Sequence, residues 1–428
     1  MSVTPTAGPD VIVIGGGPSG SAAATLLAQK GYRVELFERD KFPRFHIGES
    51  LIPHTYHVIK RLGLLDTMKQ SHFTKKYSVQ FVSQHGRLSE PFYFTEHEDH
   101  ESSQTWQVRR SEFDQLLLDN ARKHGVTVRE ETRVLEVLFE GTQAVGIKVR
   151  GPDGAEREVR AKVVVDASGQ SSLLIHKFNL REWDPLLKKA AVWTYWKGAY
   201  RDTGKDAGAT IVLQTKGKLG WFWYIPLHDD IVSVGVVSSS EYLFSKARPS
   251  RDLEDIYFEE VARCPGLEPR LKNATRCDIF RAQKEYSYRA TKTGGDGWVL
   301  VGDAFGFLDP LYSSGVLLAL QSAAMAADAI GDALAAGDVS ESRLRRWEAN
   351  YVAGMDRMRR LVVEFYEGLN FGKLIRRHPD KKGLVTDVLI GNIFKPDVDE
   401  LWPLIDALRA DEAAEKSAAH RAPATPGQ

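Results

Sequence analysis

The 428-residue sequence predicts an α/β protein with a parallel, doubly wound sheet and an inserted, mostly antiparallel sheet. A β-branched run at residues 11–14 predicts a buried strand, and the small residues at 21–27 predict a helix. A glycine-rich turn joins them, and a second strand at residues 33–38 follows. Residues 188–240, in contrast, are rich in β-branched and aromatic types and predict antiparallel strands that form one wall of a pocket.

The turn has the spacing Gly15-x-Gly17-x-x-Gly20. The first glycine permits the tight turn, the second lets the backbone approach a pyrophosphate, and the third lets the helix pack on the strand. The helix N-terminus adds amide donors and a positive partial charge. Glu38 ends the second strand 18 positions after Gly20, where a carboxylate reaches ribose hydroxyls. A glycine cluster alone is usually only a turn, but this combination predicts a bound dinucleotide.

Composition narrows the class of protein. Lys plus Arg and Asp plus Glu both number 57, so the sequence shows no footprint for a nucleic acid. The two cysteines, Cys264 and Cys277, have no metal or redox spacing, which predicts no metal site and suits a reducing cytoplasm. No signal pattern is present, and the best apolar run, residues 316–330, is interrupted by polar residues. We therefore expect a soluble cytoplasmic protein without stable membrane insertion.

The remaining segments follow in order. Residues 39–53 contain two prolines and a glycine and predict an ordered loop, followed by a helix at 55–64. Strands at 78–82 and 92–94 then interrupt the nucleotide domain. Further along, the patterns predict a strand and helix at 106–118, a small sheet at 126–150 and 158–165, a helix at 252–267, a strand at 297–304, a helix at 316–335, one long helix or a broken pair at 345–375, and a short helical segment at 383–408.

An aromatic strand stands at residues 220–226. Period-two alternation places Trp221 and Trp223 on one face and Phe222 and Tyr224 on the other. Two tryptophans on one face are most often core residues. Aromatic residues on both faces, ended by a proline, also suit the wall of a pocket, and both readings stay open.

Two polar positions follow the strand at 297–304. Asp303 falls at the carboxyl end of that strand, where ligands of open α/β sheets bind. Ser313-Ser314-Gly315 begins the next helix and offers free amides to an anion. The simpler interpretation is that Ser314 only caps the helix.

Together the glycine turn, Glu38, Arg110 with Phe113-Asp114, and Gly302-Asp303-Ala304 resemble the FAD monooxygenase superfamily of the para-hydroxybenzoate hydroxylase fold. The resemblance implies that Glu38 holds the ribose, while Arg110 and Asp303 contact the pyrophosphate or ribityl region. The set of FAD-binding residues that it implies is Gly15, Gly17, Ser19, Gly20, Glu38, Arg39, Arg44, Ile47, Gly48, Arg110, Asp303, Gly306, Gly315 and Val316.

Narrower motifs resemble the flavin-dependent halogenases. Residues 221–226 are similar to that family's W-x-W-x-I-P signature, and Phe73-Thr74-Lys75-Lys76 is similar to the segment that carries its active-site lysine. The resemblance implies Lys76 as that lysine, with Lys75 as the register alternative. Residues 42–50 and 308–315 are similar to the phenol- and pyrrole-modifying branch, whose halide site corresponds to Ser314 and Gly315.

The resemblance also implies a chemistry. FADH2, O2 and chloride or bromide would give hypohalous acid, which Lys76 would hold beside an electron-rich aromatic substrate. Trp221 and Trp223 would keep that substrate away from the flavin. A separate NAD(P)H-dependent flavin reductase would supply FADH2, and the small aromatic substrate would be free or bound to a carrier protein. The long insertions of the tryptophan-modifying branch have no counterpart here, which argues against free tryptophan. From residue type alone, Lys76 is a solvated surface charge.

Three alternatives remain open. A geranylgeranyl reductase-like flavoprotein carries a similar aromatic strand but needs neither lysine nor halide. An aromatic hydroxylase normally leaves space at the flavin that tryptophans would fill here. A flavin-binding sensor or scaffold would carry an attached signalling module.

The expected organisation is a discontinuous, Rossmann-like FAD-binding domain at residues 1–75, 104–185 and 275–345. The substrate domain, a sheet and a helix, takes residues 76–103 and 186–274. A C-terminal helical segment covers 346–410, and residues 411–428, rich in alanine, proline and charge, are expected to be a disordered tail.

Overall fold

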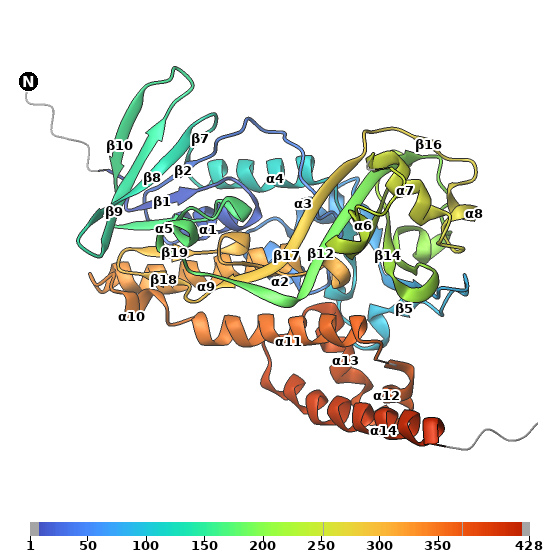
Figure 1. The fold of residues 1–428 in the computed structure, drawn as a ribbon. Coiled ribbons are helices and arrows are strands. Elements are labelled where there is room, and N and C mark those ends of the chain that lie inside the picture. The colour runs from blue at the N-terminus through green and yellow to red at the C-terminus, as the bar shows by residue number, and fades with distance from the viewer. Residues whose placement is uncertain (1–7, 251, 370, 422–428) are drawn as a thin grey trace, which may run out of the picture.

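A computed structural model describes residues 8–250, 252–369 and 371–421. Its first layer is a six-stranded sheet in the order β18-β19-β11-β1-β2-β7 (Figure 1). All neighbours are parallel except β18 and β19. The bounds are β1 Val11–Ile14, β2 Val34–Phe37, β7 Thr127–Arg129, β11 Val163–Asp166, β18 Gly294–Gly295 and β19 Trp298–Leu300. The predicted strands at 11–14 and 33–38 are therefore confirmed.

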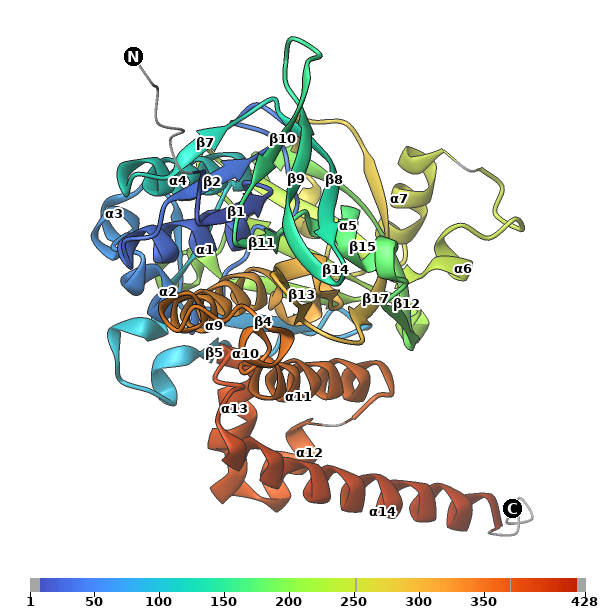
Figure 2. The same ribbon diagram turned by 90° about the vertical axis from the view of Figure 1, so that its left-hand side faces the viewer.

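Helices and a small sheet cover the six-stranded sheet. Helix α1 (Pro18–Gln29) packs against α4 (Arg110–Lys123) and α9 (Gly315–Ala335). A three-stranded antiparallel sheet, β8 (Arg133–Glu140), β9 (Gln143–Arg150) and β10 (Glu156–Arg160), contacts β11 through β9. Figure 2 shows it above the parallel strands, on the side away from α9. The short helices α2 (Thr55–Arg61), α3 (Leu65–Gln70) and α5 (Leu173–Phe178) complete this part.

A second sheet of nine strands follows the order β20-β17-β12-β15-β14-β13-β4-β5, with β16 paired to β12. Apart from the parallel pair β13 and β4, its neighbours are antiparallel, which confirms the predicted sheet type. The bounds are β4 Ser78–Val82, β5 Phe92–Tyr93, β12 Arg181–Lys197, β13 Thr210–Gln214, β14 Gly220–Pro226, β15 Ile231–Ser239, β16 Thr275–Arg276, β17 Arg281–Ala290 and β20 Gly306–Phe307. Helices α6 (Ser240–Leu243), α7 (Leu253–Val261) and α8 (Glu268–Leu271) complete this part.

Strand β17 differs from the expectation. The segment 275–345 was assigned to the FAD-binding part, but β17 and β20 belong to the nine-stranded sheet. Residues 281–290 have few β-branched side chains, so their pattern gives a weak strand signal. Hydrogen bonding along the long strand β12 forms the strand instead, and Figure 1 shows this pair crossing between the two halves of the molecule.

The C-terminal helices from α11 onward lie below α9 in Figure 1, as a separate layer. They are α11 (Glu348–Tyr366), α12 (Phe371–Arg377), α13 (Lys382–Ile390) and α14 (Leu401–Arg421), whereas the short α10 (Glu341–Leu344) packs against α9 and β18. The expected tail at 411–428 is wrong for residues 411–421, which continue α14; the remainder lies outside the described residues. Alanine and glutamate are the commonest residues of this stretch, and both favour helix.

Helix α9 bears on the expectation about membrane insertion. By length and composition it is apolar enough to cross a membrane, although polar residues interrupt the run at 316–330. In the fold, 78% of its most apolar window is buried, and it packs against α1 and α2. Its apolar composition therefore serves the protein core.

Candidate active site

A cavity of about 600 Å³ lies where the carboxyl ends of the parallel strands meet the nine-stranded sheet. Its wall contains most of the residues that the sequence singled out. Those that line it are Gly15, Gly17, Ser19, Glu38, Arg39, Arg44, Ile47, Gly48, Arg110, Trp221, Trp223, Asp303, Gly315 and Val316. Gly20, Lys76, Gly306 and Ser314 are not among the lining residues.

The three glycines of the turn have different structural roles. Gly15 has a φ of +100°, and a side chain there would begin 2.4 Å from the carbonyl oxygen of Ala167. A Cβ at Gly20 would lie 1.9 Å from the carbonyl oxygen of Gly15, so this glycine is needed where α1 packs on the turn. At Gly17 the nearest atom to such a Cβ is Nη2 of Arg44, 3.5 Å away. Gly17 therefore keeps the cavity clear, whereas Gly15 and Gly20 keep the turn together.

Glu38 is buried and holds the turn. Its Oε2 accepts a hydrogen bond of 2.7 Å from the amide of Gly16, and its Oε1 accepts one of 2.8 Å from the amide of Asp40. Parallel pairing aligns the ends of β1 and β2, which brings this carboxylate beside the glycine turn. Each carboxylate oxygen keeps further lone pairs for a hydroxyl in the cavity.

Arg110 begins α4 and is almost fully buried. Its guanidinium donates to both oxygens of Asp114, at 2.7 and 3.0 Å, and to the carbonyl oxygen of Ile47 at 2.6 Å. Arg44 also donates to Asp114, at 3.0 Å. Burial alone would raise the pKa of Asp114, but the charge and hydrogen bonds of Arg110 lower it overall. The result is a fixed, positively charged part of the cavity wall that suits a phosphate.

The other expected cofactor positions divide into two groups. Asp303 lines the cavity, and burial raises its pKa to about 6. Arg39 is exposed at the rim, where it donates to Oγ of Ser171 at 3.2 Å. Gly306, in contrast, lies in β20, and a Cβ there would approach the carbonyl oxygen of Tyr288 at 2.9 Å. Gly306 therefore serves the pairing of β20 with β17 and does not line the cavity.

The start of α9 closes one side of the cavity. Ser313 has a left-handed φ of 57°, which turns the chain into the helix. Gly315 lines the cavity, and the first amides of any helix lack partners within that helix. Ser314 is fully buried, and its Oγ has no hydrogen-bond partner among the described residues. Buried donors without an opposing carboxylate are suited to an anion.

The aromatic strand β14 confirms the predicted alternation. Trp221 and Trp223 face the cavity, while Phe222 and Tyr224 pack into a separate core with Tyr257 of α7. The indole of Trp223 donates to Oγ of Ser233 at 3.1 Å.

The strand opposite β14 makes space for that indole. Gly235 pairs with Trp223 in the sheet, and a Cβ at Gly235 would lie 2.2 Å from the indole ring. The wall position of Trp223 therefore depends on a glycine in β15.

Lys76 ends strand β3 (Thr74–Lys76), which pairs with β6 (Thr105–Gln107). Its side chain is buried, whereas Lys75 is exposed. The amine donates to Oγ of Ser50 at 2.9 Å and to the carbonyl oxygen of Leu51 at 3.1 Å. No carboxylate of the described residues pairs with it, and burial lowers its pKa to about 7. Lys76 is therefore a buried amine that loses its proton far more easily than an ordinary lysine, and it is not a surface charge.

Lys76 is connected to the large cavity and lies near the turn that precedes α9. It lines a small cavity of about 20 Å³ that shares Thr210 and Ser313 with the large one. Ser50, which accepts from the amine, lines the large cavity and forms a hydrogen bond of 3.0 Å with Oγ1 of Thr210. The amine therefore lies one side chain behind the wall of the large cavity.

Sequence reasoning missed Glu49. This carboxyl lines the cavity and accepts a hydrogen bond of 2.7 Å from the hydroxyl of Tyr195. Burial raises its pKa to about 7, against hydrogen bonds from Ser233 and Tyr195. Its neighbours Ile47 and Gly48 were singled out, but a loop glutamate gives no signal of burial in the sequence.

A second missed group holds Trp221. Its indole donates to the hydroxyl of Tyr366 in α11 at 2.9 Å, and that hydroxyl donates to Oδ2 of Asp309 at 2.9 Å. Burial raises the pKa of Asp309 to about 6. The C-terminal helical layer thus reaches the cavity wall, which a sequence separation of 145 residues does not reveal.

The cavity fits FAD on its donor set. The open backbone at Gly17, the helix N-terminus of α1 and the fixed cation Arg110 suit a pyrophosphate, and Glu38 suits a ribose.

Two family models match the chain. A model described as tryptophan halogenase matches residues 96–370, and one described as FAD dependent oxidoreductase matches residues 10–176. Together they cover the glycine turn, β14 and the start of α9.

Individual relatives agree with these models. The 1H-pyrrole-2-carbonyl-[peptidyl-carrier protein] brominase of Pseudoalteromonas luteoviolacea is 35% identical, over 77% of this chain and 79% of its own. The tryptophan 2-halogenase of Chondromyces crocatus is 34% identical, over 83% of this chain and 67% of its own. The solved structure of flavin-dependent brominase Bmp2 superimposes with a TM-score of 0.82 at 30% identity, over 96% of this chain and 100% of its own. The chain therefore belongs to the flavin-dependent halogenases, FAD-dependent oxidoreductases that halogenate aromatic substrates.

Proposed function

We propose that this enzyme uses FADH2, O2 and chloride or bromide to halogenate an electron-rich ring, a phenol or a pyrrole. The observation that carries the proposal is the buried amine of Lys76, which has no carboxylate partner among the described residues and donates to Ser50 in the wall of the cavity. When bound, reduced FAD supplies the chemistry that turns O2 and halide into hypohalous acid. The chain's own residues hold the halide, hold the oxidant beside the substrate and keep the substrate in place.

Each of these tasks has a candidate group. The amides at the start of α9 and the unpartnered hydroxyl of Ser314 would hold the halide. The amine of Lys76, when neutral, accepts a hydrogen bond from hypohalous acid and so holds it next to the ring. Trp221 and Trp223 fill the space between substrate and flavin, which prevents direct hydroxylation.

Relatives support the substrate class. The brominase from Pseudoalteromonas luteoviolacea acts on a pyrrole bound to a peptidyl-carrier protein, according to its name. The relative from Chondromyces crocatus is named for tryptophan, so tryptophan belongs among the substrates tested. We propose a phenolic or pyrrolic substrate, free or bound to a carrier protein, and a separate NAD(P)H-dependent flavin reductase as the source of FADH2.

The test compares Lys76→Ala with Lys75→Ala. Purified protein is given FADH2 from a separate reductase, O2, chloride or bromide, and a panel of phenols, pyrroles and tryptophan. The native enzyme should give a product whose mass shifts with bromide. Lys76→Ala should still bind FAD and consume O2 but give no halogenated product, and Lys76→Arg should fail because a guanidinium stays protonated. Lys75→Ala should be close to native; full halogenation by Lys76→Ala would overturn the assignment.

A pH profile separates the two groups with a pKa of about 7. If neutral Lys76 holds the oxidant, the halogenation rate falls as pH drops below about 7. Glu49 titrates in the same range, so Glu49→Gln should be measured alongside. If the fall in rate at low pH persists in Glu49→Gln, that fall reports the protonation of Lys76. If it disappears in Glu49→Gln, it reports the protonation of Glu49.

A further inference from the structure

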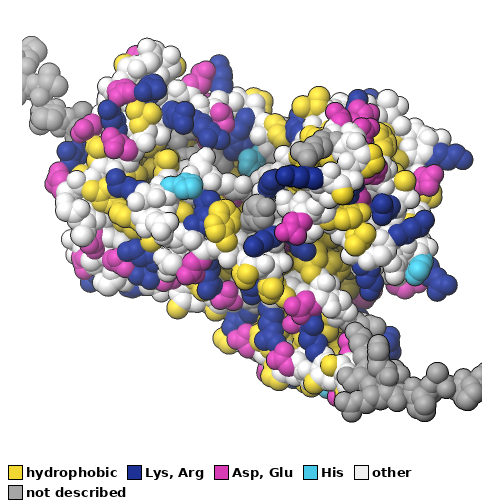
Figure 3. Space-filling view, in the orientation of Figure 1, with side chains coloured by type: hydrophobic (Ala, Val, Ile, Leu, Met, Phe, Trp, Pro, Cys, Tyr) yellow, Lys and Arg dark blue, Asp and Glu magenta, His cyan; other side chains and the backbone are white. Residues whose placement is uncertain are grey.

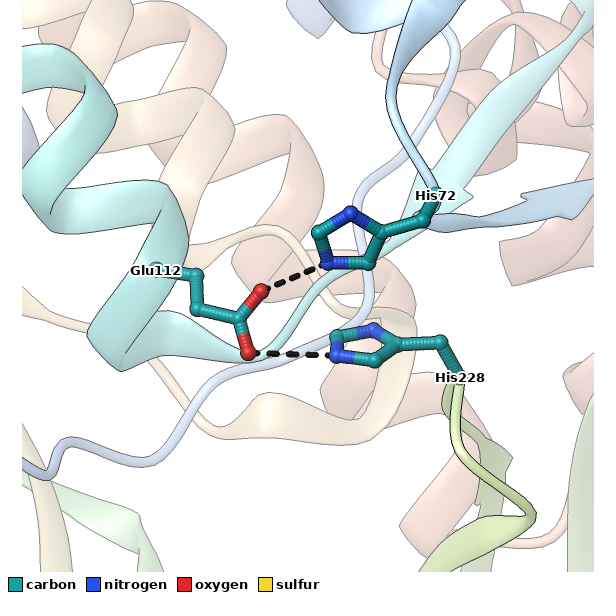
Figure 4. Close-up of side chains that lie close together, drawn as sticks. All are labelled: His72, Glu112 and His228. Atoms are coloured by element: carbon teal, nitrogen blue, oxygen red, sulfur yellow. Dashed lines mark hydrogen bonds and ion pairs between the residues drawn. The ribbon is translucent and has the colours of Figure 1, made fainter.

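Outside the cavity, two histidines and a glutamate converge on one point (Figure 4). His72 lies between α3 and β3, Glu112 is in the first turn of α4, and His228 is in the turn between β14 and β15. The three segments belong to different parts of the chain. None of the three residues lines the large cavity.

The atoms that could ligate a metal ion are close together and point toward one another. Nε2 of His72 lies 2.7 Å from Oε2 of Glu112, and Nε2 of His228 lies 3.1 Å from Oε1. All three donor atoms lie within 4.8 Å of one another. Zinc takes nitrogen and oxygen ligands at about 2.0–2.2 Å, which puts neighbouring ligands about 3.3–3.5 Å apart in a tetrahedron. The two nitrogens contact different oxygens of Glu112, so one ion would occupy the space between the rings while the carboxylate moves back to admit it.

The surrounding charges are balanced. The positive charge of Arg109 opposes the binding of a cation, because its Nη1 lies 3.5 Å from Oε1 of Glu112. Asp229 offsets it, because its Oδ2 lies 3.7 Å from Arg109 and 3.6 Å from Nε2 of His228. This second carboxylate is exposed and lies beside the ring of His228.

We propose that His72, Glu112 and His228 bind one Zn²⁺ ion, with Asp229 or a water molecule as the fourth ligand. Two imidazoles and a carboxylate are a donor set that zinc accepts, and the exposed side of His72 leaves an entry path. The sequence gives no spacing signal, because the ligands are 40 and 116 residues apart.

The ion would tie together the two halves of the molecule. Phe73 follows His72 directly, and its ring contacts those of Phe113 and His228. The segment that precedes Lys76 would then be fixed at once to α4 and to the turn that follows the aromatic strand. The ion has a structural role, outside the chemistry proposed above.

Zinc binding is tested on the full-length, FAD-bound enzyme without a histidine tag, after treatment with a chelator. Isothermal titration with Zn²⁺ should give one site per chain, and Co²⁺ should give the absorption bands of a tetrahedral site. His72→Ala and Glu112→Gln should each weaken binding by about tenfold or more. Zn²⁺ should raise the thermal midpoint of the native protein, and less so that of either variant.

The matched control is His85→Ala, which removes an exposed histidine elsewhere. It should bind Zn²⁺ as the native protein does. The side chain of His72 is 65% exposed, so its replacement leaves the fold intact. Absence of a saturable site in the native protein, or equal affinity in His72→Ala and His85→Ala, overturns the proposal. These readouts do not depend on halogenation, so the zinc site and the proposed function can fail separately.

Discussion

The two sheets of this enzyme build their shares of one cavity by different means. The parallel side uses backbone: a turn with a positive φ at Gly15, a clear approach at Gly17 and the amide end of α1. The nine-stranded side uses side chains, chiefly the indoles of Trp221 and Trp223. A backbone cradle fits one invariant ligand, whereas a side-chain wall can be altered residue by residue. The comparison teaches that the glycine turn is set by geometry within one strand–turn–helix unit, whereas the aromatic wall depends on contacts between distant segments.

The parallel side should fail completely when its backbone approach is blocked. Gly17→Val fills the cavity with a side chain whose only near neighbour is the end of Arg44, so the protein should fold. FAD affinity should drop by about a hundredfold or more, about 3 kcal/mol, and halogenation should be lost. Flavin absorbance and the apoprotein's thermal midpoint measure the two effects. Gly20→Val is the contrast, because its Cβ would meet the backbone of Gly15 and prevent folding. Native FAD affinity in Gly17→Val would break the comparison.

The nine-stranded side should fail more gradually. Trp223→Ala empties a buried aromatic site, with an expected loss of about 3–5 kcal/mol in unfolding free energy. If the indole also screens the flavin, the variant should release hydroxylated product or peroxide. Denaturant unfolding and product mass are measured together. A lower stability with an unchanged product spectrum would make this wall purely structural.

Lys76→Met, unlike Trp223→Ala, should increase the free energy of unfolding. Because burial lowers the pKa of Lys76 from its usual 10.5 to about 7, the unfolded chain binds more protons between these pH values. Native stability therefore rises with pH over this window, and the buried amine destabilises the fold most below pH 7. Lys76→Met should raise unfolding free energy by a few kcal/mol at pH 6, with a gain that vanishes above about pH 10.5. Denaturation at several pH values tests this, and a loss of stability at pH 6 would contradict it.

The smallest effect is expected where the C-terminal layer meets the wall. Tyr366→Phe removes the hydroxyl that joins Trp221 to Asp309, with an expected loss of about 1–2 kcal/mol. FAD binding should be unchanged, while leakage of peroxide should rise if the link orients Trp221. Peroxide yield per FADH2 is the measurement, with Tyr32→Phe, whose hydroxyl bonds Gly331 far from the wall, as the matched variant. Equal peroxide yields from both variants would assign Tyr366 a packing role only.

Sequence reasoning was strongest where structure is local. The turn at 15–20, Glu38 and the alternation along β14 are all set by spacings within one or two elements, and all were predicted in place. Equal numbers of basic and acidic residues give a formal net charge of zero, and Figure 3 shows the two kinds of side chain intermingled over the face in view. The pairs that needed tertiary structure were missed. Glu49 with Tyr195 and Trp221 with Tyr366 join residues more than a hundred positions apart.

The glycine opposite Trp223 restricts how this family member can evolve. Any residue larger than glycine at position 235 collides with the indole of Trp223 and with Cβ of Trp193, its partner in β12, 2.5 Å away. Loss of the Trp223 indole leaves a void that a side chain at position 235 can fill only when residue 193 also changes. None of the three positions can drift alone, so a viable lineage must change them together or pass through a poorly packed intermediate. Natural variation at residues 193, 223 and 235 should therefore be linked, and a directed-evolution library intended to widen the substrate range should randomise all three together.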